Sequence, residues 1–246
     1  MRRAGRCAAI RNDLKITFAD DNVSPAICVD TSCLRRARAN STVALSSQSL
    51  LGYVFGMLDR HAAFELVCQY TASDSLRKHM LAVEAAMRAY AAHYGEEVEK
   101  WGIVGLLHDF DYERWPDPPD HPLQGAAILT GLGYPADVIY AIKSHADYLT
   151  DCPRVSRLDK VLYACDELAG FVTAVALVRP ERLAGLEARS VQKKLKAKGF
   201  AASINRDDIV RGAADLGVPL DEHITFVIAA LQPAAETLGL TPVASG

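Results

Sequence analysis

The chain has 246 residues, of which 50% are hydrophobic and 23% are charged, as in a soluble globular protein with a sizeable core. Its formal net charge of -3 provides no global basic field of the kind that binds nucleic acid polymers. The longest largely apolar run, residues 171–178, is too short to cross a bilayer, and no apolar stretch follows the basic N-terminus to make a secretory signal. The six cysteines include no CxxC pair, and free thiols in a reducing compartment are the simplest interpretation of them. The composition predicts a cytoplasmic protein.

Residues 1–50 differ from the rest of the chain. They mix polar, basic and small residues without helical or alternating periodicity, and such a segment buries little apolar surface. We interpret them as an N-terminal extension of uncertain order that the chemistry does not need; an edge or dimer-contact segment is the alternative. Apolar spacing begins at Leu51, and we expect one domain over residues 51–240.

The first clear helix follows Ser73 or Asp74, either of which can cap it, and Gly95 is placed to end it. His79 lies beside its apolar stripe, which consists of Leu76, Met80, Val83, Met87 and Tyr90. A second helix is predicted from the acidic pair at residues 96–97 to His108.

Four prolines within residues 110–122 predict a loop, after which helicity resumes until Gly131 to Gly133. Pro135 can open a helix with His145 in its last turn, and Ser156 can cap a long one. Three further helices are predicted at residues 191–198, 207–216 and 219–238. No convincing alternating strand occurs, so the domain is predicted to be all-α.

The pair His108-Asp109 ends an apolar helical run, and adjacent side chains on a helix diverge by about 100°. Such a pair can bind one metal ion from two directions, or its Asp can reach a second ion. Other histidines occur where helices end or meet loops, at His79, His121 and His145, and Asp166 joins them. A mixed imidazole and carboxylate set without thiolate suits Mn, Fe, Co, Ni or Zn.

Five segments carry a more specific pattern: RKHMLAVEAAM, GLLHDFDYE, HPLQGAAIL, AIKSHADY and DKVLYACDELAGF. Their order resembles the HD-domain superfamily of metal-dependent phosphohydrolases, which implies an HD-domain helical bundle. By this resemblance, the first ion is bound by His79, His108, Asp109 and Asp166. The second is bound by His121 and His145, with Asp109 bridging. If His121 only caps the helix that follows it, a site for one ion remains.

Two side chains are candidates for a catalytic role besides Asp109. Asp111 is placed to position water or to act as a general acid, although it could equally solvate the loop. Lys160 shares a predicted helix with Asp166 and could pair with phosphate oxygens, the alternative being a solvated helix face. His61, His93 and His223 lie outside the pattern and are expected to be solvated or structural.

The resemblance implies a hydrolase that cleaves a nucleotide or another small phosphoester through a metal-activated water. Three alternatives stay open: a carboxylic ester hydrolase (an esterase), a di-iron oxygenase of the same fold, and a non-catalytic ligand sensor. The expected partner is a small phosphoester or ester substrate, with no nucleic acid polymer, no membrane and no organic cofactor; a homo-oligomer is left open. No P-loop, G-x-S-x-G or G-x-G-x-x-G motif offers a competing site.

Overall fold

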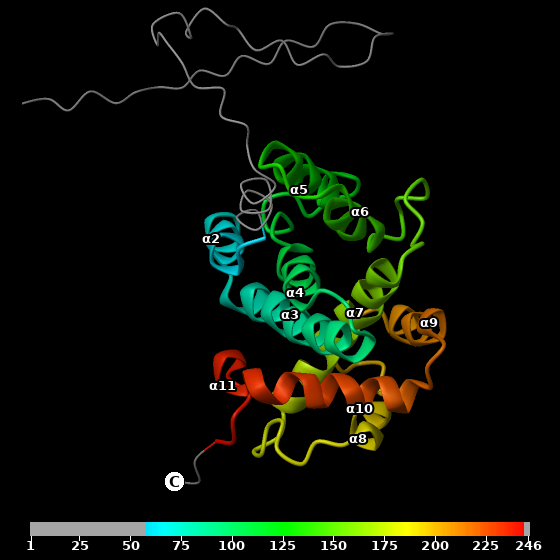
Figure 1. Cartoon of the computed structure of the whole chain (residues 1–246). Coiled ribbons are helices and arrows are strands. Elements are labelled where there is room, and N and C mark those ends of the chain that lie inside the picture. Colours follow the sequence, from blue (N-terminus) through cyan, green and yellow to red (C-terminus); the bar gives the residue numbers. More distant parts are fainter. Residues whose placement is uncertain (1–57, 244–246) are drawn as a thin grey trace, which may run out of the picture. The chain divides into compact units, whose positions relative to one another are not determined.

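The computed structural model describes residues 58–243, and over that range the chain is helical without a strand (Figure 1). The predicted all-α fold is therefore confirmed for this part of the chain. The predicted extension at residues 1–50 lies outside the described residues, as do 51–57 and 244–246. Among the described helices, none is long and apolar enough to cross a membrane.

Helix α3 (Asp74–Tyr94) packs against α4 (Val98–Leu107), α7 (Arg157–Leu177) and α10 (Leu220–Leu231) (Figure 1). The Ser73 side chain accepts a hydrogen bond from the Leu76 N–H, as the capping pattern predicted. Gly95 ends the helix with φ 71°, a left-handed conformation that costs glycine little. The predicted stripe is buried from Met80 to Tyr90, which fixes the face of α3 that carries His79.

Two groups of helices flank this centre. Helix α2 (Arg60–Tyr70) packs on α4, while α5 (Asp120–Gly131) and α6 (Ala136–Ser144) pack together, with α6 reaching α4 and α7 (Figure 1). Helices α4 and α6 therefore come near α7, and α5 is held beside α6, although these helices are far apart in sequence.

Helix α7 begins with a capping box, in which Ser156 accepts from the Asp159 N–H and the Asp159 carboxylate accepts from the Ser156 N–H. Helix α9 (Arg206–Leu216) lies against α7 at very short range. A Cβ atom at Gly212 would stand 2.6 Å from the Ala164 Cα, which is backbone and cannot move aside. Glycine at this position thus sets how closely α9 approaches the helix of Asp166.

The last predicted helix, residues 219–238, is not continuous. Beyond α8 (Ala188–Leu195) and α9, the chain forms α10, a 3-10 turn at Gln232–Ala234 and then α11 (Ala235–Leu238). Pro233 is the cause, since proline has no N–H for the helical ladder and its ring clashes with the preceding turn. His223 in α10 is buried and structural: it accepts from the Tyr90 hydroxyl (2.6 Å) and donates to the Ala164 carbonyl (2.9 Å).

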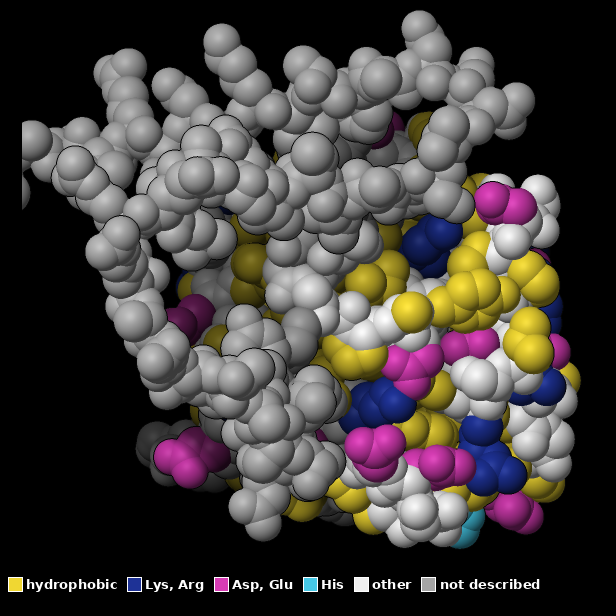
Figure 2. Space-filling view, turned by 45° about the horizontal axis from the view of Figure 1, so that its top comes forward, with side chains coloured by type: hydrophobic (Ala, Val, Ile, Leu, Met, Phe, Trp, Pro, Cys, Tyr) yellow, Lys and Arg dark blue, Asp and Glu magenta, His cyan; other side chains and the backbone are white. Residues whose placement is uncertain are grey.

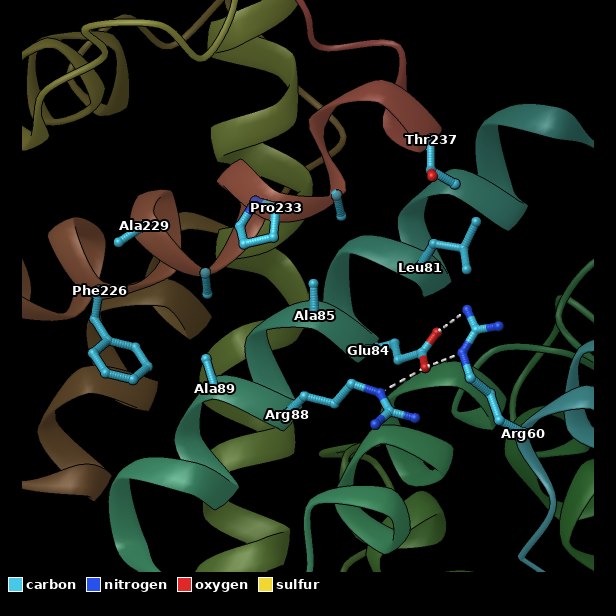
Figure 3. A pocket seen from close by; sticks show the side chains of 12 residues that line it. Arg60, Leu81, Glu84, Ala85, Arg88, Ala89, Phe226, Ala229, Pro233 and Thr237 are labelled. Atoms are coloured by element: carbon cyan, nitrogen blue, oxygen red, sulfur yellow. Dashed lines mark hydrogen bonds and ion pairs between the residues drawn. The ribbon is translucent and has the colours of Figure 1, made fainter.

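An ion-pair network joins α2, α3 and α4. Glu84, with only 3% of its surface exposed, accepts two hydrogen bonds from Arg60 (2.6 and 2.8 Å) and one from Arg88 (2.8 Å). Arg88 also binds Glu99 of α4 with both terminal nitrogens (2.6 and 2.8 Å). Figure 3 shows Glu84 between the two arginines at one end of a groove of about 700 Å³, which α3 and the chain around Pro233 enclose.

Candidate metal centre

Six side chains from five helical segments meet at one place. The segments are α3, the end of α4, the start of α5, the end of α6 and the middle of α7. Their donor atoms form two groups, and Asp109 belongs to both; the full set is His79, His108, Asp109, His121, His145 and Asp166. These are the six residues that the sequence pattern nominated.

The first group contains His79, His108, Asp109 and Asp166. The His79 Nε2 lies 3.0 Å from the Asp166 Oδ1 and 3.3 Å from the His108 Nε2. The Asp109 Oδ2 lies 3.4 Å from the His108 Nε2 and 3.8 Å from the His79 Nε2. Donors bound tetrahedrally to one ion at about 2.0–2.1 Å stand roughly 3.3 Å apart, so this spacing fits a single transition-metal ion.

The second group contains His121, His145 and the other oxygen of Asp109. The Asp109 Oδ1 lies 3.2 Å from the His121 Nε2 and 3.5 Å from the His145 Nε2, and the two nitrogens are 3.2 Å apart. One carboxylate thus presents one oxygen to each group. This is the arrangement of a bridging ligand between two ions.

The opposite ring nitrogens explain why these imidazoles point inward. The Nδ1 of His108 donates to the Gly105 carbonyl (2.8 Å), that of His145 to the Ile142 carbonyl, and that of His121 to the Asp111 carboxylate (2.8 Å). With the proton on Nδ1, each Nε2 presents a bare lone pair to the centre. Lone pairs and carboxylate oxygens at 3.2–3.5 Å repel one another unless a cation lies between them. The donor set therefore fits divalent ions.

Asp111 lies behind His121, where only 1% of its surface is exposed. One of its oxygens accepts from His121, and the other accepts from the Gly125 N–H of α5 (2.7 Å). His121 itself has non-helical backbone angles (φ -77°, ψ 133°). Its two ring nitrogens face Asp111 and Asp109, so the contacts favour the ligand alternative over the capping one.

The same groups attract protons as well as metal ions. Burial lowers the pKa of His108, but the carboxylates of Asp109 and Asp166 outweigh it and hold that pKa well above the usual value. For His121, burial is likewise outweighed by Asp109 and Asp111, which raise its pKa to about 9. Burial would raise the pKa of Asp109, yet His108 and its other histidine partners hold it well below the usual range.

This leads to a prediction about pH. Below pH 9 a metal ion must displace protons from imidazoles of raised pKa, so metal affinity should rise as the pH increases from 6 to 9. Calorimetry at pH 7 in buffers of different ionisation enthalpy should show protons released on binding of Mn²⁺ or Zn²⁺. The exposed His61 provides a control, because His61→Ala should leave the release unchanged. An affinity independent of pH over this range would contradict the prediction.

Five of the six candidate ligands, all except His108, line a pocket of about 710 Å³. Sequence reasoning did not find its other walls, which include three tyrosines and residues of α9. These additional residues are Tyr112, Ala146, Asp147, Tyr148, Tyr163, Glu167, Ser203, Ile204, Asn205, Asp208 and Arg211. Asp147, Tyr148 and Glu167 lie close in sequence to candidate ligands and could have been proposed for that reason. No residue near the five motif segments indicates that α9 belongs to the pocket.

Lys160 is placed differently from the candidate ligands. It lines a neighbouring cavity of about 510 Å³, together with Arg154 and Asp215, and is not among the residues that line the metal pocket. Its predicted contact with phosphate stays a prediction.

Residues 76–170 match the family model of the HD domain. This match confirms, over residues 76–170, the resemblance to the HD domain that was drawn from the sequence. Two curated relatives are named Ribonuclease Y, from Nitratidesulfovibrio vulgaris strains DP4 and Hildenborough. Each is 33% identical over 102 residues, or 40% of this chain. The match covers 18% of the relatives' length. No solved structure matches the chain significantly.

Proposed function

We propose that the chain is a hydrolase of a nucleotide or another small phosphoester, with two divalent ions bound by the six ligands. The observation that carries the proposal is the Asp109 carboxylate, whose two oxygens face two separate donor groups. When bound, such a pair of ions would lower the pKa of a bound water and stabilise the charge that develops on the attacking and leaving oxygens.

The protein groups around the ions have separate tasks in this proposal. Asp109 holds the two donor groups at a fixed separation. Asp111 accepts from the His121 Nδ1, which keeps the Nε2 lone pair free, so we assign it a positioning task in preference to that of a general acid. The Tyr148 hydroxyl donates to the His121 carbonyl, and burial together with Asp109 and Asp111 raises its pKa to about 12. Tyr148 therefore keeps its proton near neutral pH.

Two observations support a small substrate. The pocket of about 710 Å³ lies within the usual range of small-molecule sites, about 300–1,000 Å³. On the face shown in Figure 2, basic side chains alternate with acidic and hydrophobic ones and form no continuous basic surface across its described residues. The relatives are named as ribonucleases, and RNA cleavage breaks a phosphoester bond, which supports the bond class.

The test is metal analysis of the purified protein, followed by a screen of phosphorylated metabolites with the native metal restored. Phosphate release that chelation abolishes and the metal restores would support the proposal. Cleavage of a short acyl nitrophenyl ester alone would favour the esterase alternative, and turnover requiring iron and oxygen would favour the oxygenase. Full inertness with metal bound would point to a ligand sensor.

A further inference from the structure

The metal pocket has one wall that the metal ligands do not form. Helix α9 contributes Asp208 and Arg211 to it, and the loop after α6 contributes Asp147. Of the described residues that line this pocket, Arg211 is the one Lys or Arg side chain. Five carboxylates line the same pocket and would repel an anionic group. The positive charge that could attract such a group would come from bound metal ions and from Arg211.

Arg211 is held in place without being buried. Its Nη1 lies 2.7 Å from the Asp147 Oδ2, its Nη2 donates to the Asp208 Oδ1, and its guanidinium lies 5.7 Å from the centre of the Tyr163 ring. The side chain is 48% exposed. These contacts use two of its five N–H donors, which leaves three for another acceptor.

The acids beside Arg211 have further partners of their own. Asp147 also pairs with Arg154, and the Tyr163 hydroxyl, with its single proton, lies within hydrogen-bond distance of both Asp147 (3.0 Å) and Asp208 (2.8 Å). Because Arg154 and the Tyr163 hydroxyl offset part of the negative charge of these two carboxylates, the carboxylates do not fully neutralise Arg211. Its remaining positive charge can act on a group in the pocket.

The wall is also tied to the metal ligands along the chain. Asp147 follows His145 by two residues, and Tyr163 precedes Asp166 by one helical turn on α7. The glycine contact between Gly212 and Ala164 fixes α9 against that same helix. Arg211 thus has a defined position relative to both donor groups.

We propose that Arg211 binds the phosphate group of the substrate at the metal centre and so selects phosphoesters over neutral esters. This inference rests on the proposed function. A guanidinium donates to phosphate oxygens in a planar, charge-assisted geometry, which a neutral acyl ester cannot exploit.

The test uses inorganic phosphate as the probe and calorimetry on the Mn²⁺-loaded protein. Arg211→Gln should weaken phosphate binding about tenfold, the lower end for a hydrogen bond to a charged group, because the side chain is half-exposed. Arg211→Lys should recover part of the loss. With a phosphoester substrate, Arg211→Gln should raise KM and change kcat little.

Two controls separate this role from a structural one. Arg157 is also half-exposed, pairs with Glu96 (3.2 Å) and lies over the Tyr94 ring, yet does not line the pocket, so Arg157→Gln should bind phosphate normally. Arg154→Gln removes the other arginine from Asp147. If uncovering that acid were the whole effect, Arg154→Gln would weaken phosphate binding as much as Arg211→Gln, and the inference would be wrong.

The outcomes also separate this inference from the proposed function. If the wild-type protein binds phosphate and Arg211→Gln binds it equally with full metal content, the inference alone is overturned. If the metal-loaded wild type neither binds phosphate nor cleaves any phosphoester, the proposed function falls together with it.

Discussion

Replacing Asp109 by alanine should abolish turnover and remove both metal ions. Asp109 is the one ligand common to the two donor groups, and each group loses an oxygen at 3.2–3.4 Å from its nearest imidazole. Bound metal stabilises the transition state by several kcal/mol, which corresponds to a loss of roughly a thousandfold or more in rate. Metal content by mass spectrometry and phosphate release would be measured on the same samples.

Two variants give this experiment its contrast. Asp117→Ala removes an exposed carboxylate from the loop that follows the centre, and it should retain both ions and full activity. His121→Ala deletes a ligand of the second group only, so one ion should remain. Retained turnover in Asp109→Ala would refute the ligand assignment, and loss of both ions in His121→Ala would refute the division into two groups.

The second large effect concerns stability. Glu84→Ala should lower the free energy of unfolding by about 3 kcal/mol, because it leaves two arginines facing an apolar groove without their shared carboxylate. Arg60 and Arg88 keep side-chain exposures of 46% and 23%, so water can compensate in part and the loss stays at the low end for a broken buried pair. Urea unfolding followed by circular dichroism would measure it.

A matched acidic residue on α2 provides the comparison. Glu65 pairs with His61 at 3.4 Å, and its side chain is 70% exposed. Glu65→Ala should therefore change the free energy of unfolding by less than about 0.5 kcal/mol. Equal effects of the two substitutions would mean that the Glu84 network contributes no more than an ordinary surface pair.

The amino-acid pattern was sufficient for the main helices. Ser73, Gly95 and Ser156 act at helix ends through their own side chain or backbone freedom, so neighbouring residues reveal them. The error in the last predicted helix has the same local origin: apolar periodicity continues past Pro233, but the backbone ladder cannot. The six candidate ligands were nominated through the resemblance to the HD-domain superfamily, in which histidines and aspartates follow the same order, and their binding of metal stays a prediction.

Packing decided the rest of the centre. The Nδ1 atoms of His108 and His145 donate to backbone carbonyls. Every residue has a backbone carbonyl, so these hydrogen-bond partners cannot be predicted from residue type. Arg211 lies 45 residues beyond Asp166 on a helix whose sequence carries no metal-site pattern, and Gly212 brings that helix to the pocket. Candidate ligands can be nominated from sequence because metal binding depends on the chemistry of particular side chains. Which carbonyl, acid or guanidinium surrounds the ligands depends on how closely distant helices approach, and only the tertiary structure fixes that distance.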